Sequence, residues 1–304
     1  MTMTLINQDT ALSQSLVMNL NDSSDYLYGA SSKKYRVYAT SSAANPIVNV
    51  QSNWLYSDPF SKSPVIENLV IDGQNQGVTG ILLQNVVGGQ IRNVTIKNCA
   101  VGIHLRSYYG LWSECNCLKH IRMENVTKGI VFTTTGPYTY WDSDQGKFIT
   151  NPGDSAGFTT IDDVGIKLAN TSDAIGIQIG GIQISNDPYK NDVTTTVIKP
   201  YSSRIKANIW MDSAGGTGIK IINGEIKFAQ SNISIQGPSN GIGVDLRDAT
   251  TQDRAIWYNQ FSKFTGTPPN DFIYNNQRGF MLATAGISNP ILPSGAITDI
   301  LLKS

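Results

Sequence analysis

Charged residues are scarce in this chain, and neither sign predominates. The 304 residues include 23 lysines and arginines and 23 aspartates and glutamates, so charged residues make up 15% and the formal net charge is zero. Nucleic acids and anionic membrane surfaces attract proteins chiefly through a basic electrostatic field. The composition therefore argues against a nucleic acid or an anionic membrane as the main partner.

Cysteine is rare, and long apolar segments are missing. The three cysteines, Cys99, Cys115 and Cys117, give no even disulfide framework, and the last two are too close together for the usual zinc motifs. We interpret them as buried small hydrophobic residues and predict no metal and no cofactor. No apolar run reaches the roughly 18 residues of a transmembrane helix, so no membrane insertion is expected. Because no basic residue precedes Lys33, we also expect no Sec-type signal peptide.

A repeated pattern of short alternating segments is present instead. The segment "VIENLVIDGQNQGVTGILL" (65–83) is followed by "QIRNVTIKNCAVGIHL" (90–105), and Ile66, Asn68 and Ile71 recur as Ile91, Asn93 and Ile96. Alternation with a period of two residues predicts β-strands. Recurrence at a spacing of 20 to 50 residues is typical of repeat proteins.

A tetrapeptide of glycine, isoleucine, any residue and an apolar residue also returns along the chain. It begins at Gly80, Gly102, Gly129, Gly165, Gly176, Gly218 and Gly241. We interpret each copy as one strand of a repeat. No repeat is amphipathic enough to fold alone, so each should stack on the next at about 4.8 Å, with like residues on like residues.

Asparagine and glycine are expected at the corners between these strands, because both tolerate left-handed backbone angles. Asn68 with Asn93, and Asn98 with Asn125, lie at the repeat spacing and should form hydrogen bonds between neighbouring repeats. Helical repeats are excluded in this region because no stretch has the 3.6-residue period. A leucine-rich repeat is disfavoured because its LxxLxLxxN pattern is missing.

With these motifs, the region 64–132 resembles the right-handed parallel β-helix of the pectin-lyase-like superfamily, and the likeness continues loosely to about residue 246. The resemblance implies an all-β solenoid of roughly seven or eight coils. In style the repeat is closest to the β-helices of phage tail spikes and appendages, many of which are homotrimers. The fold also hosts lyases, hydrolases, esterases and epimerases, so it implies no single activity.

The chain is predicted to have three parts. Residues 1–45 form an N-terminal cap, in which "TALSQSLVMNL" (10–20) suits a short helix, and residues 46–248 form the β-helix. Two loops, 133–157 and 185–203, interrupt it. Residues 249–304 are a non-repeat C-terminal segment that caps the stack or contacts other subunits.

Aromatic residues with polar neighbours mark the candidate glycan-binding surface. Sugar rings stack on aromatic faces, while their hydroxyls bind polar groups. The loop after a predicted strand and the first insertion supply Arg106, Tyr108, Tyr109, Trp112, Glu114, Tyr138, Tyr140, Trp141, Asp142 and Asp144. The alternative is that these aromatic residues pack the loops onto the scaffold or fill a subunit interface.

Candidate catalytic groups are incomplete. Asp162-Asp163 with Arg204 and Lys206 resembles fragments of the polygalacturonase pattern, but the Gly-His-Gly motif between them is absent. The segment "DSDQG" (142–146) resembles a calcium loop only at its start. We interpret His104 as hydrogen-bonded or solvent-facing. Catalytic residues thus stay unassigned.

Three functions remain open. The first is a virion or surface spike that binds host or environmental glycans without turnover, on an extracellular surface and as a homotrimer. The second is a polysaccharide depolymerase, a lyase or glycoside hydrolase, with a site in the loops or between subunits. The third is a purely structural assembly protein.

Overall fold

A computed structural model describes most of the chain up to residue 245. The described residues are 2–20, 25–30, 34–52, 63–108, 111–134, 138–151, 155–180, 203–221, 226–227, 232–238 and 241–245, with short pieces at 256–257, 274–275, 282–285 and 300–301. Every regular element within these ranges is a β-strand. None of the described residues belongs to a helix long and apolar enough to cross a membrane.

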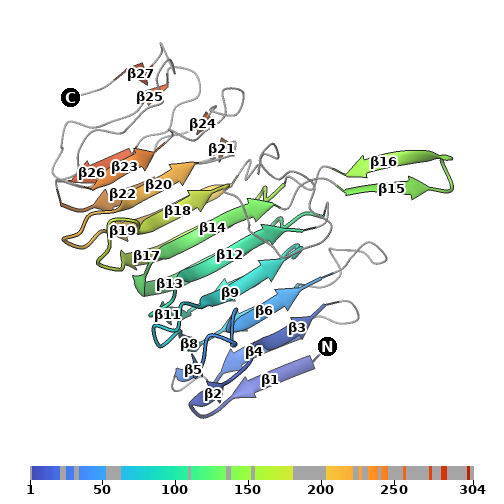
Figure 1. The fold of residues 1–304 in the computed structure, drawn as a ribbon, viewed down its shortest axis with the longest axis horizontal. Coiled ribbons are helices and arrows are strands. Elements are labelled where there is room, and N and C mark those ends of the chain that lie inside the picture. Colours follow the sequence, from blue (N-terminus) through green and yellow to red (C-terminus); the bar gives the residue numbers. More distant parts are fainter. Residues whose placement is uncertain are drawn as a thin grey trace.

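Two parallel sheets account for most of the strands (Figure 1). Sheet A contains β1 (Thr2–Ile6), β2 (Thr10–Leu12), β4 (Asp25–Gly29), β5 (Tyr35–Ala39), β7 (Val65–Glu67), β8 (Leu69–Asp72), β10 (Gln90–Arg92), β11 (Thr95–Lys97), β13 (Cys117–Val126), β17 (Thr160–Leu168), β19 (Arg204–Trp210), β22 (Asn232–Gln236) and β26 (Leu282–Ala285). Sheet B contains β3 (Leu16–Asn19), β6 (Val48–Gln51), β9 (Thr79–Gln84), β12 (Val101–Ser107), β14 (Lys128–Thr134), β18 (Ile175–Ile179), β20 (Thr217–Ile221) and β23 (Ile242–Asp245).

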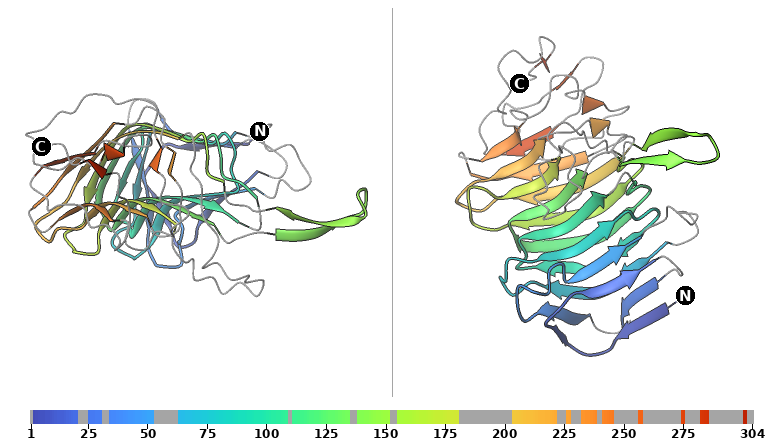
Figure 2. Two further views of the ribbon diagram at one scale, coloured as in Figure 1. Left: turned by 90° about the horizontal axis from the view of Figure 1, so that it is seen from above. Right: turned by 45° about the vertical axis from the view of Figure 1, so that its right-hand side comes forward.

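Three two-stranded pairs complete the described strands. They are the antiparallel hairpin of β15 (Tyr138–Asp142) and β16 (Lys147–Asn151), the pair of β21 (Ile226–Lys227) and β24 (Ile256–Trp257), and the pair of β25 (Tyr274–Asn275) and β27 (Ile300–Leu301). The hairpin projects away from the stacked sheets in both views of Figure 2.

Each strand of sheets A and B pairs in parallel with its counterpart in the following repeat. Ile66 is opposite Ile91, and Ile71 is opposite Ile96, which confirms the recurrence seen in the sequence. The isoleucines, valines and leucines that alternate inward from both sheets form one continuous buried core. Inward rows of matched aliphatic side chains therefore hold the repeats in register.

The repeated glycine is required by close backbone approach. Gly80, Gly102, Gly129, Gly176 and Gly218 lie at equivalent positions in five consecutive strands of sheet B. In the first four, a Cβ atom would lie 2.5–2.8 Å from the carbonyl oxygen of the next glycine in the series. Real Cβ atoms do not approach backbone oxygens so closely. Two other copies differ: Gly165 lies in sheet A, and the register puts Gly243 rather than Gly241 beside Gly218.

A line of left-handed residues bends sheet A. Asn68, Asn93, His120 and Asp163 occupy successive positions across four repeats and have φ angles of 53–58°. The Nδ2 of Asn93 donates to the Oδ1 of Asn68 at 2.6 Å, and the Nδ2 of Asn125 donates to the Oδ1 of Asn98 at 2.9 Å. Both predicted asparagine pairs are confirmed.

Two sequence interpretations are wrong. The short helix in "TALSQSLVMNL" does not form, because β2 and β3 occupy that segment and pair in parallel with β5 and β6. Residues 2–51 thus contribute strands to both sheets, and the proposed cap boundary at residue 45 stays a prediction. The buried-cysteine interpretation holds for Cys99, whereas Cys115 is exposed and Cys117 is half-buried.

Candidate functional site

The two aromatic segments leave the stack at the same end of sheet B. Strand β12 ends at Ser107, which is the register partner of Thr134 at the end of β14. The 108–116 loop follows the first strand, and the β15–β16 hairpin follows the second after three residues. Parallel neighbours share a direction, so both segments begin at adjacent points of one edge.

Within the 108–116 loop, the predicted residues have unequal exposure. The Arg106 guanidinium lies over the Tyr108 ring, 4.6 Å from its centroid, and both residues are half-buried, as is Trp112. Glu114 is only 8% exposed and accepts a hydrogen bond from the Ser155 hydroxyl. Arg106, Tyr108 and Trp112 are therefore partly exposed, whereas Glu114 ties the loop to the next repeat.

The loop is further fixed by bonds to the preceding repeat. The Tyr108 backbone N–H donates to Asn85 Oδ1 at 2.7 Å, and Asn116 bonds the backbone of both Val86 and Gly89. These bonds hold the loop to a rigid corner, as a preorganised binding surface requires.

The hairpin residues are only partly described. Tyr138, Tyr140, Trp141 and Asp142 form strand β15, but their side chains lie outside the described part of the structure. Asp144 is exposed in the hairpin turn, and Tyr109 lies outside the described residues. The second predicted insertion, 185–203, falls outside them except for Ser203.

Both members of the acid pair Asp162-Asp163 contact basic side chains. Asp162 lies 3.5 Å from the Lys206 ammonium, and Asp163 contacts His120 Nδ1 at 2.8 Å and Arg122 Nη2 at 3.0 Å. Because Asp163 is in the left-handed region, both carboxylates face outward despite being adjacent.

The hydrogen bond from His120 is the largest influence on Asp163 and lowers its pKa; burial, the next largest, raises it, and the hydrogen bond and charge of Arg122 lower it again, so that the pKa is lowered overall. The polygalacturonase-like reading did not include His120 or Arg122. The pairing of β13 with β17, which brings these two residues to Asp163 across the inserted hairpin, is not visible in the sequence.

The other predicted histidine, His104, lies on the outer face of sheet B. Its Nε2 is 2.7 Å from the Thr133 hydroxyl, so the hydrogen-bonded interpretation is confirmed. Burial lowers the pKa of His104 to about 3, and the nearby charges of Arg106 and Lys128 act in the same direction. This imidazole is therefore neutral at physiological pH.

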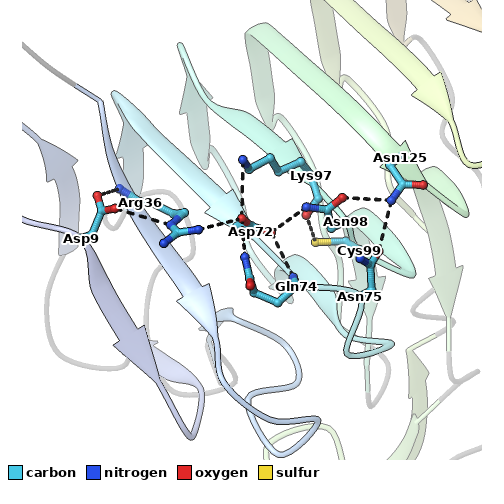
Figure 3. A network of polar contacts seen from close by, with 9 residues as sticks. All are labelled: Asp9, Arg36, Asp72, Gln74, Asn75, Lys97, Asn98, Cys99 and Asn125. Atoms are coloured by element: carbon cyan, nitrogen blue, oxygen red, sulfur yellow. Dashed lines mark hydrogen bonds and ion pairs between the residues drawn. The ribbon is translucent and has the colours of Figure 1, made fainter.

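A buried carboxylate organises the corner between the two sheets (Figure 3). Asp72 is 1% exposed and accepts hydrogen bonds from Asn98 Nδ2 at 2.9 Å and Gln74 Nε2 at 2.7 Å. Arg36 and Lys97 approach its Oδ2 at 3.4 and 3.6 Å. Burial raises the pKa of Asp72, but these hydrogen bonds and the Lys97 charge outweigh it and lower the pKa overall.

A polar groove of about 480 Å³ lies beside this corner. Its lining residues are Lys97, Asn98, Glu124, Asn125, Lys167, Leu168, Asn170 and Asp212. Among the described residues, no group of three or more histidine, cysteine or acidic side chains is placed to hold a metal ion. Sequence reasoning missed this groove because its residues come from four repeats.

Comparisons with known proteins assign no family. No family model matches the chain, and no curated protein matches it. One solved structure, Geobacillus virus E2 ORF18, aligns with a TM-score of 0.29 and 14% identity over 81% of this chain. This chain spans about half, 52%, of that protein's length. A likeness at this level assigns neither fold nor function.

Proposed function

We propose that this chain is a right-handed parallel β-helix of roughly seven or eight coils, a virion or surface spike-type protein that binds host or environmental glycans without turnover. The observation that carries the proposal is the pairing of Ser107 with Thr134, which starts the aromatic loop and the aromatic hairpin side by side. Long in-register parallel sheets supply the rigid support.

The chemistry of the loop suits a sugar. Tyr108 is held by the Arg106 guanidinium and Trp112 stays half-exposed, so aromatic faces and a cationic donor lie on one short segment. Sugar C–H faces stack on such rings, and hydroxyls accept bonds from the guanidinium. The partner is then a polysaccharide or cell-surface glycan.

Binding without turnover is favoured by the state of the acid pair. Glycoside hydrolysis needs one carboxyl group that holds a proton at working pH. Asp163 has the opposite property, because His120 and Arg122 lower its pKa. Asp162 is paired with Lys206. Both groups stabilise the outer face of sheet A in this account.

Truncating the loop aromatics tests the proposal. Tyr108→Ala and Trp112→Ala are expected to abolish binding to glycan-coated surfaces, while Tyr28→Ala, a half-buried outward tyrosine of β4 on sheet A, leaves it unchanged. Unchanged binding by both loop variants would show that this loop is not the glycan-binding surface.

An activity assay tests the second claim. The protein is incubated with a panel of polysaccharides and assayed for reducing ends and for the absorbance of unsaturated products. The expected result is no product above the buffer control. Sustained product release would replace the proposal with a depolymerase, and mass photometry would test the homotrimer.

A further inference from the structure

We propose that the polar groove beside the asparagine corner is a second saccharide site, one that takes a neutral sugar unit through Glu124, Lys167 and Asn125. The site is independent of the loop surface, because the corner residues precede the strands of sheet B whereas the aromatic loops follow them. The groove can therefore bind sugar whether or not the loops do.

The groove exists because one repeat is a residue shorter at the corner. Glu124 pairs with Lys167 and Val126 pairs with Leu168, so Asn125 has no counterpart in β17. The asparagine ladder from Asn98 to Asn125 consequently stops there. A regular repeat would have filled this space with another corner side chain.

The interrupted ladder leaves an acceptor at the groove. Asn125 Nδ2 donates to Asn98 Oδ1 at 2.9 Å and to Asn75 Oδ1 at 3.1 Å, and the Asn125 side-chain oxygen points away from this network (Figure 3). Among the described residues, no group donates to that oxygen. It is fixed in position by the ladder behind it and is available to a ligand hydroxyl.

Charge along the groove alternates. Lys97, Glu124 and Lys167 are register neighbours on three successive strands, and Asp212 lines the groove after β19. Lys97 is partly engaged by the buried Asp72, whereas Glu124 and Lys167 are exposed. Two ammonium groups thus lie among two carboxylates, an arrangement that matches a ligand whose groups both donate and accept but which carries no net charge.

The residue next to the lining Lys167 on the following strand carries an indole ring, which does not itself line the groove. Trp210 is the register partner of Lys167, is 38% exposed, and lies over Gly165, where an added Cβ would be 3.1 Å from the ring. The Trp210 Nε1–H donates to Gln236 Oε1 at 3.1 Å, which fixes the ring plane. The groove volume of about 480 Å³ falls within the range of about 300–1,000 Å³ of small-molecule sites.

The test measures binding of tetrasaccharides of glucose, N-acetylglucosamine and galacturonate by saturation-transfer NMR and calorimetry. We expect a neutral tetrasaccharide to bind. Glu124→Ala and Lys167→Ala should each raise its Kd about tenfold or more, since each removes a charged hydrogen-bonding partner. Lys119→Ala, an exposed lysine on sheet A outside the groove, should leave the Kd unchanged.

Urea unfolding confirms that each variant is folded, and Trp112→Ala separates this site from the loop surface. Groove binding should survive Trp112→Ala. The proposal is overturned if no neutral tetrasaccharide binds, if Glu124→Ala and Lys167→Ala bind as wild type does, or if calcium alone binds at the groove. Loss of binding only in Trp112→Ala would overturn the groove while supporting the loop surface.

Discussion

Replacing Gly129 by alanine is expected to destabilise the protein far more than the same change at Gly165, although both residues begin the same Gly-Ile motif. At Gly129 a Cβ would lie 2.5 Å from the Gly176 carbonyl oxygen and 2.8 Å from Ile166 Cγ2. The first obstacle is backbone within a hydrogen-bonded stack and the second is core. Neither can move without shifting the next strand.

The size of the effect follows from these distances. Overpacking a close-packed site typically costs about 1–3 kcal/mol. The backbone obstacle puts Gly129→Ala at the upper end, near 3 kcal/mol of unfolding free energy. At Gly165 the nearest atoms belong to two exposed side chains, the Trp210 ring and Arg122 Cδ, at 3.1 and 3.2 Å, and none is backbone. Alanine loses less backbone entropy than glycine, so Gly165→Ala should stay within about 0.5 kcal/mol of wild type.

Urea unfolding followed by far-ultraviolet circular dichroism measures both variants under the same conditions. The expected result is a clear fall in the midpoint for Gly129→Ala and almost none for Gly165→Ala. Equal midpoints for the two variants would refute the close-approach explanation of the repeated glycine.

Three further results are expected. In urea unfolding, Asn93→Ala should lower the free energy of unfolding by about 1–2 kcal/mol more than Asn93→Gly does, because only glycine adopts the left-handed backbone angle without strain. Equal losses for the two variants would contradict a left-handed backbone at this position. Asp72→Asn should reduce the fall in the free energy of unfolding at acid pH. A carboxylate with a lowered pKa stabilises the fold above its unfolded pKa and loses that contribution as pH falls through its folded pKa. An unchanged slope at acid pH would contradict this. The His104 imidazole, with a pKa of about 3, should show no NMR titration between pH 5 and 8, and a midpoint there would show that it is not buried as described.

The sequence predicted the part of the fold that depends on local repetition. Ile66 with Ile91, and Asn68 with Asn93, are separated by regular repeats, so equal spacing in the chain becomes adjacency in space. The pattern failed where a match was accidental. Gly165 shares the motif but belongs to sheet A, where it is the register partner of Arg122.

The polar clusters were much harder to predict. His120 and Asp163 meet across 43 residues of chain because the insertion between them is a hairpin outside the stack. The groove depends on a one-residue register shift at Asn125, which is invisible without the pairing of β13 with β17. Distances set by insertions and bulges do not follow from periodicity.

Spacing along one row of sheet A tests the central claim that the chain winds in parallel, in-register repeats. Val70, Thr95, Arg122, Gly165, Asn208 and Ser234 are successive register partners. With the native cysteines replaced by alanine, spin labels at Val70 and Asn208, or at Val70 and Ser234, report the backbone separation.

Parallel strands about 4.8 Å apart predict about 19 Å for the first pair and about 24 Å for the second, before the length of the labels is added. The account predicts this increase by a single strand spacing. A second distance equal to or shorter than the first, or an increase of several spacings, would contradict it.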